Sequence, residues 1–471
     1  MNTANLSAID ALSAMQSGDI SCENYVGALV ERAEAYEDLN AFISFDAERV
    51  LEAACAADEE RATGAEPGPL LGLPIVLKDN IDTAQYPTTG GTPGLRENQP
   101  TANSPVAQSL FDAGAICFGK SNLHELAYGV TCNNGAFGPS RNPYNRERIP
   151  GGSSGGTGTA VGARIAPAGL GSDTGGSVRI PAALCGIVGF RPTTGRYSQE
   201  GVVPISNTRD TIGPMTRSVA DAALLDRVIA GEDDGLQPAE LKGLRIGVPR
   251  GYYYEDLDMA TALVMDAALE RLSGYGIELI EADVPDVAAA DEAASMPVAL
   301  YETVVLLNRY LNDHGIGLDY AELVSQIGSP DVKGIMGSLI GEGAIPPELY
   351  KQALEQYRPR LRDIFRNYFA ENNLSAIVFP TTPMPAAKIG DDETVNVNGT
   401  EVPTFMTYIR NTDPASNAAL PGLSIPAGLT DAGLPVGMEF DGPEGSDREL
   451  LSIGYAVEEM EPAFPEPTLD P

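Results

Sequence analysis

Two glycine-serine segments contain the residue types that most directly point to chemistry. Residues 150–158 read Pro-Gly-Gly-Ser-Ser-Gly-Gly-Thr-Gly, and residues 169–181 place Ser177 in a run of small residues with four glycines. Glycines let backbone N–H groups approach a reacting carbonyl oxygen closely, which an oxyanion hole requires. The composition of these segments therefore favours an active site with a serine nucleophile.

Two other interpretations of the segments are weaker. A flexible linker is disfavoured because Ile149 and Pro150 precede the first segment and an apolar helix follows it. A phosphate-binding loop would need the pattern G-x-x-x-x-G-K-[ST]. No lysine lies between residues 121 and 241, so the segments cannot form one.

A serine nucleophile needs a base, and histidine, its usual partner, is scarce in this chain. There are only two, His124 and His314. The cluster around Ser177 lacks the G-x-S-x-G spacing of a nucleophile elbow, and Ser153 and Ser154 are flanked as G-G-S-S-G-G. Counting alone leaves a Ser-His-Asp triad open, but an arrangement of serine and lysine is the natural remainder.

Lys78 is the lysine whose position fits this role. It follows the apolar run 71–77, which reads as a buried strand. Burial disfavours the ammonium form of a lysine and so favours the neutral form, which accepts a proton. The alternative is a structural lysine paired with Asp79 or Asp82.

The elements around these residues alternate between strands and helices. Short apolar runs predict strands at 71–77, 115–118, 165–170, 244–248, 277–280, 376–379, 423–425 and 436–438. Helical spacing predicts helices over 7–54, 106–113 and 260–272, and Pro181 is placed to open another. Alternation of this kind is typical of an α/β layered fold.

The chain reads as one large domain over residues 1–471. Strand signals are scarce between 286 and 370, which we interpret as a helical insertion or cap beside the sheet. The catalytic core is then about 65–285 and 371–460. No internal repeat and no clear interdomain linker divides it.

Composition limits the partners. The net charge of −36 argues against a nucleic-acid-binding groove, because phosphates would be repelled. No apolar run reaches the roughly 20 residues of a membrane helix. The five cysteines are scattered without a C-x-x-C pair, which favours reduced thiols and a cytoplasmic protein. The acidic, lysine-poor composition fits a salt-rich host or simple solubility, and neither interpretation bears on the chemistry.

The motifs G-G-S-S-G-G at 151–156 and G-S-D-T-G-G-S-V-R at 171–179, with Lys78 upstream, resemble the amidase signature family. The resemblance covers about residues 65–230 and 375–445. It implies an α/β fold in which a large twisted mixed β-sheet is flanked by helices. It also implies amide hydrolysis through an acyl-enzyme, without a metal or an organic cofactor.

The resemblance also implies a role for each motif residue. Ser177 is the nucleophile, Ser153, preceded by a cis peptide bond, relays the proton, and Lys78 is the base. The remaining roles are an oxyanion hole, orientation of the relay and support of the loop. The oxyanion hole is formed by the backbone N–H groups of Thr174, Gly175, Gly176 and Ser177, Ser154 orients the relay, and Asp173 and Arg179 support the loop.

Four further stretches, 123–131, 179–186, 203–211 and 409–417, are similar to the aryl-acetamide branch of the family. This likeness implies a primary amide with an aromatic group, held in an apolar pocket. The residues that would line the pocket are Ala127, Tyr128, Gly129, Thr131, Phe405 and Ile409. The alternative for each of them is plain core packing.

Other functions within the same fold stay open at this point. The A subunit of the tRNA-dependent amidotransferase hydrolyses glutamine and passes ammonia to a partner, although the stretch 203–211 departs from its pattern. Anilides, esters and carbamates suit the same acyl-enzyme chemistry. A binding protein on an inactive scaffold is disfavoured because all three catalytic positions are filled. We expect a small-molecule amide substrate, no direct contact with nucleic acid or membrane, and leave a homodimer open.

Overall fold

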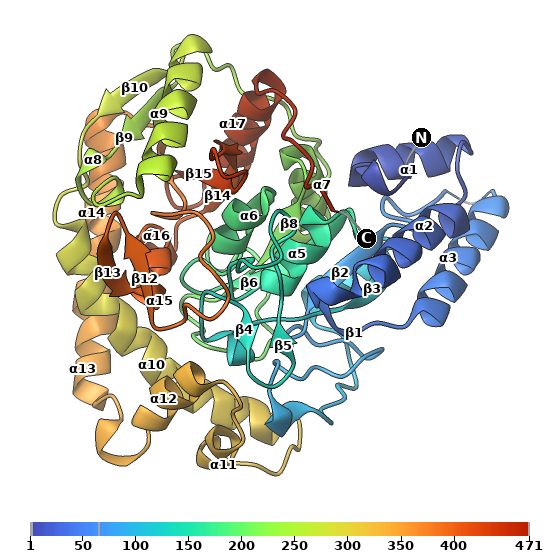
Figure 1. Cartoon of the computed structure of the whole chain (residues 1–471), viewed down its shortest axis with the longest axis horizontal. Helices are drawn as coiled ribbons and strands as arrows, with labels where there is room; N and C mark the ends of the chain where they lie inside the picture. Colours follow the sequence, from blue (N-terminus) through green and yellow to red (C-terminus); the bar gives the residue numbers. More distant parts are fainter. Residues whose placement is uncertain (1–2, 65, 470–471) are drawn as a thin grey trace.

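The computed structural model describes residues 3–64 and 66–469 (Figure 1). Its centre is an eleven-stranded sheet in the order β1-β3-β2-β6-β8-β7-β14-β15-β11-β9-β10. In that order the strands are Phe42–Ser44, Ile116–Ser121, Pro74–Lys78, Ala168–Asp173, Thr211–Thr216, Val188–Arg191, Gly422–Leu429, Pro435–Asp441, Ala376–Pro380, Arg245–Val248 and Glu278–Glu281. Helices flank this mixed sheet, which confirms the predicted α/β fold class.

The strands β2 and β6, which lead into Lys78 and into the second glycine-serine segment, run in the same direction, so their carboxyl ends lie on the same side of the sheet. The strand β2 lies between β3 and β6 and runs parallel to both, with Leu77 opposite Leu170 of β6. Parallel strands end at the same edge, so the side chains that follow them meet there. Lys78, at the end of β2, is thereby brought beside the last residues of β6.

The helices vary from four residues to twenty-seven. In the first half of the chain they are α1 (Ala8–Ser17), α2 (Cys22–Ala35), α3 (Ala47–Ala62), α4 (Pro105–Asp112), α5 (Gly155–Gly162), α6 (Arg179–Cys185) and α7 (Val219–Ala230). In the second half they are α8 (Arg250–Tyr253), α9 (Met259–Gly274), α10 (Val287–Asp313), α11 (Tyr320–Ser325), α12 (Pro330–Ser338), α13 (Pro347–Gln352), α14 (Arg358–Asn372), α15 (Thr404–Ile409), α16 (Asp413–Ala418) and α17 (Asp447–Met460).

The two faces of the sheet are covered differently. Val436, Met438 and Phe440 of β15 pack into an apolar core with α7, α9 and α17. Successive side chains of a strand point to opposite faces. Glu439 therefore faces the other way, toward α6, where its carboxylate meets Arg179. This second face is polar inside and carries the glycine-serine segments.

Each predicted strand has an observed counterpart, but three strands of the sheet, β1, β7 and β8, were not predicted. Helical spacing over 7–54 predicted helix throughout, but the three-residue strand β1 interrupts it and pairs antiparallel with β3. A strand this short carries no period-2 pattern, because its residues are all half-buried at the sheet edge.

The described segment from 287 to 372 consists of helices joined by short loops, and it contains no strand. The longest, α10, contains Pro297 and packs against α13, α14 and α16. These helices form one side of the molecule beside the sheet (Figure 1). The contact between α10 and α16 matters for the site. The helix α16 begins directly after Thr412, which hydrogen-bonds the second glycine-serine segment at Gly175.

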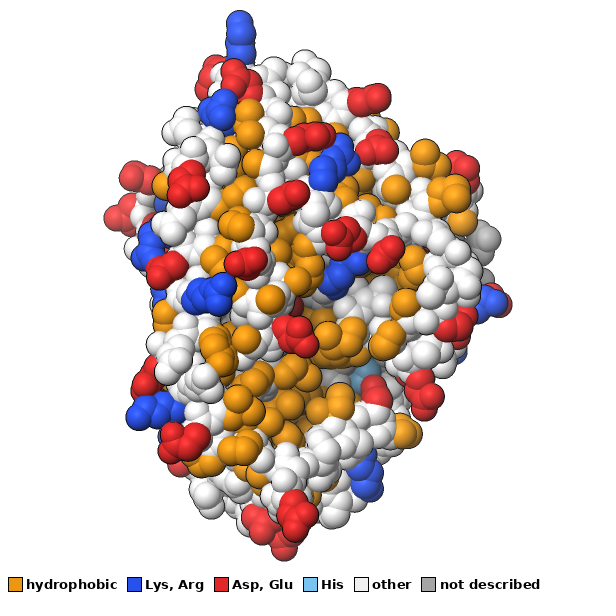
Figure 2. Space-filling view, turned by 90° about the vertical axis from the view of Figure 1, so that its left-hand side faces the viewer, with side chains coloured by type: hydrophobic (Ala, Val, Ile, Leu, Met, Phe, Trp, Pro, Cys, Tyr) orange, Lys and Arg blue, Asp and Glu red, His pale blue; other side chains and the backbone are white. Residues whose placement is uncertain are grey.

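The surface is dominated by isolated acidic side chains. Figure 2 shows the face that carries α13 and α14, with hydrophobic side chains gathered in its lower part and carboxylates scattered around them. Among the residues that the structure describes, no helix is both long enough and apolar enough to cross a bilayer.

Candidate active site

Lys78 is completely buried where β2 ends. Its Nζ lies 2.7 Å from Ser153 Oγ and 2.9 Å from Ser172 Oγ. Burial lowers the pKa of Lys78 to about 7, because the ammonium form loses its hydration. A substantial fraction of Lys78 is therefore neutral near neutral pH, as a base requires.

The interpretation of Lys78 as one half of an ion pair does not hold. Asp79 pairs with Lys120 at 3.0 Å, and Asp82 accepts hydrogen bonds from Tyr310 and faces the ring of His314. The hydrogen-bond partners of Lys78 in the described chain are serine hydroxyls and one serine carbonyl.

Ser153 and Ser154 join the two glycine-serine segments at the start of α5. The Gly152–Ser153 peptide bond is cis, as the resemblance implies. The N–H of Ser154 donates to the carbonyl of Ser177 at 3.2 Å, and the N–H of Ser172 donates to Ser154 Oγ at 3.3 Å. Ser154 thus fixes the spacing between the segment that holds Ser153 and the one that holds Ser177.

Ser177 lies just before α6, partly exposed in the wall of a cavity. Within the described chain its hydroxyl has no hydrogen-bond partner, so the structure brings Lys78 and Ser153 into contact and leaves Ser177 Oγ unbonded beside the cavity. Catalytic hydrogen bonds are often loose without substrate and tighten in the complex.

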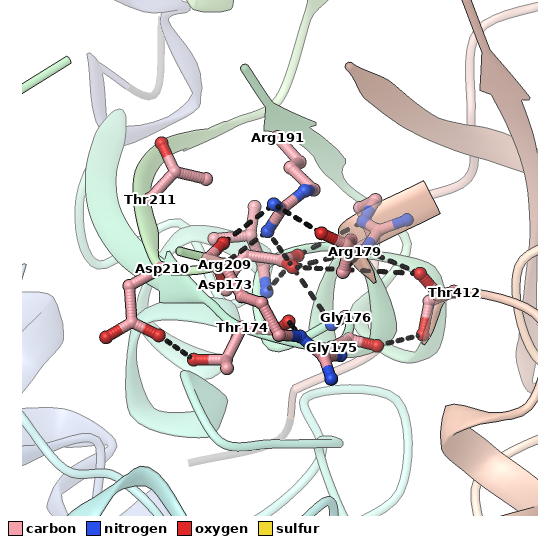
Figure 3. Close-up of polar contacts among 12 residues, drawn as sticks. Asp173, Thr174, Gly175, Gly176, Arg179, Arg191, Arg209, Asp210, Thr211 and Thr412 are labelled. Carbon is pink, nitrogen blue, oxygen red and sulfur yellow. Dashed lines mark hydrogen bonds and ion pairs between the residues drawn. The ribbon is translucent and has the colours of Figure 1, made fainter. Parts of the chain in front are cut away.

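The loop between β6 and α6 presents its backbone N–H groups in two directions (Figure 3). The N–H of Gly176 donates to Asp173 Oδ1 at 2.9 Å. The N–H groups of Thr174, Gly175 and Ser177 meet no acceptor in the part of the chain that the structure describes. The resemblance implied four backbone N–H groups as oxyanion donors. Three of them are unbonded in the described chain, and the fourth, that of Gly176, donates to Asp173.

Glycine is required at 176 for two reasons. Its φ of 138° lies in a region that side-chain-bearing residues rarely adopt. A Cβ at this position would also lie 2.1 Å from Thr412 Oγ1. The hydroxyl of Thr412 donates to the carbonyl of Gly175 at 2.6 Å (Figure 3). This hydrogen bond holds the loop, and it requires Thr412 to lie close to residue 176.

A buried ion-pair cluster supports the loop from below. Asp173 accepts hydrogen bonds from Arg179 and Arg191, all three side chains being fully buried (Figure 3). Burial alone would raise the pKa of Asp173, but the two guanidinium groups hold it well below the usual range of a carboxyl. Asp173 therefore stays ionised and keeps its bonds to the loop.

Several site residues have no role in the sequence-based interpretation. Ser172 contacts Lys78 directly, and Asn80 donates to Ser172 Oγ at 2.9 Å. The others brace the loop or line the cavity: Arg191, Arg209, Asp210, Asp291, Ser295, Thr412 and Asp413. Ser172 lay inside the quoted motif, and Arg209 and Asp413 lay in stretches that resembled the aryl-acetamide branch.

The cavity beside Ser177 has a volume of about 390 Å³, which suits a small organic molecule. Five of the six residues predicted to line a pocket do line it: Ala127, Tyr128, Gly129, Phe405 and Ile409. Thr131 lies outside it, because its hydroxyl turns away and donates to Asp392 at 2.9 Å. Apolar side chains of α10, including Met296 and Leu300, form the opposite wall.

Neither histidine ring contacts a serine of the two segments. The Nε2 of His124 lies 3.0 Å from Asp331 of α12, and its Nδ1 accepts the N–H of Cys132 at 3.2 Å. The ring of His314 stacks on Tyr310 and faces Asp82. In the described chain, Lys78 hydrogen-bonds Ser153 and Ser172, and neither histidine ring hydrogen-bonds a serine of these segments.

A family model described as Amidase matches residues 24–451. The chain belongs to the amidase signature family. It is 45% identical over 449 residues to the indoleacetamide hydrolase of Rhizobium radiobacter, covering 95% of this chain and 96% of that protein. It is 42% identical over 464 residues to the mandelamide hydrolase of Pseudomonas putida, covering 95% and 90%.

A solved structure agrees with these relatives. The native peptide amidase from Stenotrophomonas maltophilia superimposes with a TM-score of 0.85 at 30% identity, covering 99% of each chain. The resemblance read from the sequence is thus confirmed, and the protein is an amidase that hydrolyses amide C–N bonds. The A subunit of the glutamyl-tRNA(Gln) amidotransferase of Desulforapulum autotrophicum is more distant, at 36% identity.

Proposed function

We propose that this amidase hydrolyses aromatic primary amides to a carboxylic acid and ammonia through an acyl-enzyme on Ser177. The observation that carries the proposal is the 2.7 Å contact between buried Lys78 and Ser153, which lie behind a serine facing an apolar cavity. Ser177 is the nucleophile, Ser153 the relay and Lys78 the base.

Acylation begins when Ser177 Oγ attacks the amide carbon. Its proton passes to Ser153 Oγ while the proton of Ser153 passes to neutral Lys78. The carbonyl oxygen becomes an oxyanion, and the free N–H groups of Thr174, Gly175 and Ser177 are placed to stabilise it. The relay then returns the proton to the amide nitrogen, the C–N bond breaks, and ammonia leaves.

Deacylation repeats the relay with water. Water attacks the ester carbon as its proton passes through Ser153 to Lys78. The bond between the acyl carbon and Ser177 then breaks, the proton returns to Ser177 Oγ, and the acid leaves. Both halves require Lys78 to be neutral at the start, which its burial favours.

An aromatic acyl group is supported by the cavity walls. Tyr128, Phe405, Ile409, Met296 and Leu300 give the cavity a mainly apolar lining of a size that suits one or two rings. The relatives at 42–45% identity are named for indoleacetamide and mandelamide, both aromatic primary amides.

The alternatives share the catalytic residues and differ in the substrate. The amidotransferase A subunit is disfavoured because its substrate, glutamine, has a charged amino acid backbone that this apolar cavity matches poorly. Anilides and esters would differ in the leaving group, and carbamates would differ in the acyl group as well. An activity panel of phenylacetamide, indole-3-acetamide, an anilide, a carbamate and glutamine separates them, and size-exclusion chromatography tests whether the protein acts alone or as a homodimer.

The central test is Ser177→Ala with Ser325→Ala, an exposed serine on α11, as the matched control. We expect the Ser177 variant to lose amide hydrolysis by about 10⁴-fold or more and to form no acyl-enzyme detectable by mass spectrometry. The Ser325 variant should retain both. Near-normal hydrolysis by Ser177→Ala would contradict the proposed mechanism.

A further inference from the structure

The substrate cavity is mainly apolar, and its most deeply buried polar side chains lie together at one corner. That corner is lined by Arg209, Asp291, Ser295 and Asp413. These residues come from three distant parts of the chain, namely the loop before β8, the first half of α10 and the start of α16. All four side chains are largely buried, so their charges and hydrogen bonds are not shared with bulk solvent.

The corner is held together by specific hydrogen bonds. The guanidinium of Arg209 donates to Asp413 Oδ1 and, at 2.8 Å, to Ser295 Oγ. The hydroxyl of Ser295 donates to Asp413 Oδ2 at 2.5 Å. Asp291 accepts one hydrogen bond from Asn417, at 3.0 Å. Asp413 is therefore paired with a cation, whereas Asp291 is bonded to the amide of Asn417 and to the carboxyl group of Asp413.

The two carboxyl groups of the corner lie close together. Burial and the nearby carboxylate of Asp413 raise the pKa of Asp291 well above its usual value. Two carboxyl groups offer several acceptor positions, and the described side chains that donate to them are Arg209, Ser295 and Asn417. The corner therefore has acceptor capacity left over.

The corner is adjacent to the reacting centre. Asp413 Oδ1 lies so close to the oxyanion loop that a Cβ on Gly175 would be 2.7 Å from it. Arg209 Nε donates to the carbonyl of Thr174 at 3.2 Å. A substrate whose amide carbon sits at Ser177 thus has its acyl group beside this corner, with the apolar walls around the rest of it.

We propose that Asp291 is a specificity-determining residue that accepts a hydrogen bond from an N–H or O–H group on the aromatic acyl part of the substrate. The preferred amides then carry such a donor on the ring or next to it, as in an indole or a hydroxylated side chain. Amides with an acyl part of the same shape but no donor are disfavoured, because the acceptor would be buried without a partner. This inference rests on the proposed function.

A purely structural role for the corner makes a different prediction. If Asp291 only braced α10 against α16, its replacement would slow all substrates by the same factor. A ratio of two kcat/KM values measured on one enzyme preparation cancels such a factor. The ratio for two isosteric substrates therefore reports recognition of the donor alone.

The experiment compares indole-3-acetamide with benzofuran-3-acetamide, in which a ring oxygen replaces the N–H. We expect the unmodified protein to favour the indole by about tenfold in kcat/KM. Asp291→Leu should reduce this ratio to about one to three, while Asp291→Asn, which keeps a carbonyl acceptor of the same size, should retain most of it. Glu292→Gln, at the exposed neighbouring carboxylate of the same cavity, should keep the ratio as well.

The outcomes separate this inference from the proposed function. Equal kcat/KM for both amides in the unmodified protein would overturn the role of Asp291 and leave aromatic amide hydrolysis standing. So would a ratio that survives Asp291→Leu or disappears in Glu292→Gln. Hydrolysis of neither amide would overturn the proposed function, and the inference with it. Equal rates in the unmodified protein would overturn the inference even if a variant fails to fold, and Asp291→Asn gives a second, more conservative variant at the same position.

Discussion

Two buried lysines lie on neighbouring parallel strands, and they differ in one respect. Lys120 of β3 is opposite Leu77 of β2, one residue before Lys78. Lys120 Nζ contacts Asp79 at 3.0 Å and Thr88 Oγ1 at 2.9 Å. Lys78 contacts serine hydroxyls and no carboxylate. The difference between the two buried lysines is therefore the carboxylate partner, which Lys120 has and which Lys78 does not have in the described chain.

The alternation of side chains along β2 explains how adjacent residues are kept apart. Lys78 and Asp79 follow each other in the chain, and consecutive extended residues point to opposite sides. Asp79 is held on its side by Thr89, whose N–H donates to Oδ2 at 3.0 Å, and by Lys120. The nearest carboxylate in the sequence is thereby directed away from the base.

The most severe test of this comparison is Lys78→Met, which removes the base and leaves a side chain of similar length. We expect kcat/KM for an aromatic amide to fall by about 10³–10⁴-fold, because no other group that contacts Ser153 can accept its proton. The fold should persist, since methionine avoids burial of an unpaired charge. Stopped-flow measurement of acylation checks the rate, and circular dichroism checks the fold. A retained acylation burst would show that another group is the base.

The matched change at the other lysine, Lys120→Met, should act on stability instead. It leaves the buried carboxylate of Asp79 without its cation, and removing one partner of a buried pair costs about 3–5 kcal/mol. Urea denaturation measures the loss. The double variant Lys120→Met with Asp79→Leu should recover much of it, because no buried charge remains. A stability equal to that of the unmodified protein would mean that Lys120 and Asp79 do not form the pair described.

These two sites also show what could be predicted from sequence. The apolar run before Lys78 predicted a buried strand that ends on a lysine, and the structure has both. The same reasoning could not decide between a base and a structural cation, because Asp79 and Asp82 are close in the chain. That decision depends on Thr89, Lys120 and the direction of side chains, which only the folded sheet determines.

The contacts that form the polar corner of the cavity could not be predicted from the sequence, for a different reason. Asp291 and Asn417 are 126 residues apart, and Ser295 and Asp413 are 118 apart. No periodic pattern relates residues at such separations, since their contact arises from the packing of α10 on α16. Thr131 shows the opposite error: it lies near pocket residues in sequence, but its side chain leaves the cavity to bind Asp392.

The pH dependence of kcat/KM provides a finer test of Lys78, the lysine without a carboxylate partner in the described chain. Burial lowers the pKa of Lys78 to about 7, and only the neutral amine accepts a proton. Below pH 7 the neutral fraction falls about tenfold per pH unit, so kcat/KM should rise with pH up to about 7 and then level off. A neutral amide substrate adds no titration of its own. A profile that stays flat from pH 5 to pH 7, with the fold intact by circular dichroism, would contradict Lys78 as the base.

The smallest expected effect is a shift of that profile in Ser172→Ala. Ser172 Oγ lies 2.9 Å from Lys78 Nζ and accepts a hydrogen bond that favours the ammonium form. Its loss should move the inflection of the kcat/KM profile to lower pH by about half a unit to one unit, which corresponds to about 1 kcal/mol. Ser198→Ala, at an exposed serine, should leave the inflection in place. A loss of rate in Ser172→Ala without a shift would assign Ser172 to support of the loop, and the hydroxyl would then have no part in setting the basicity that distinguishes Lys78 from Lys120.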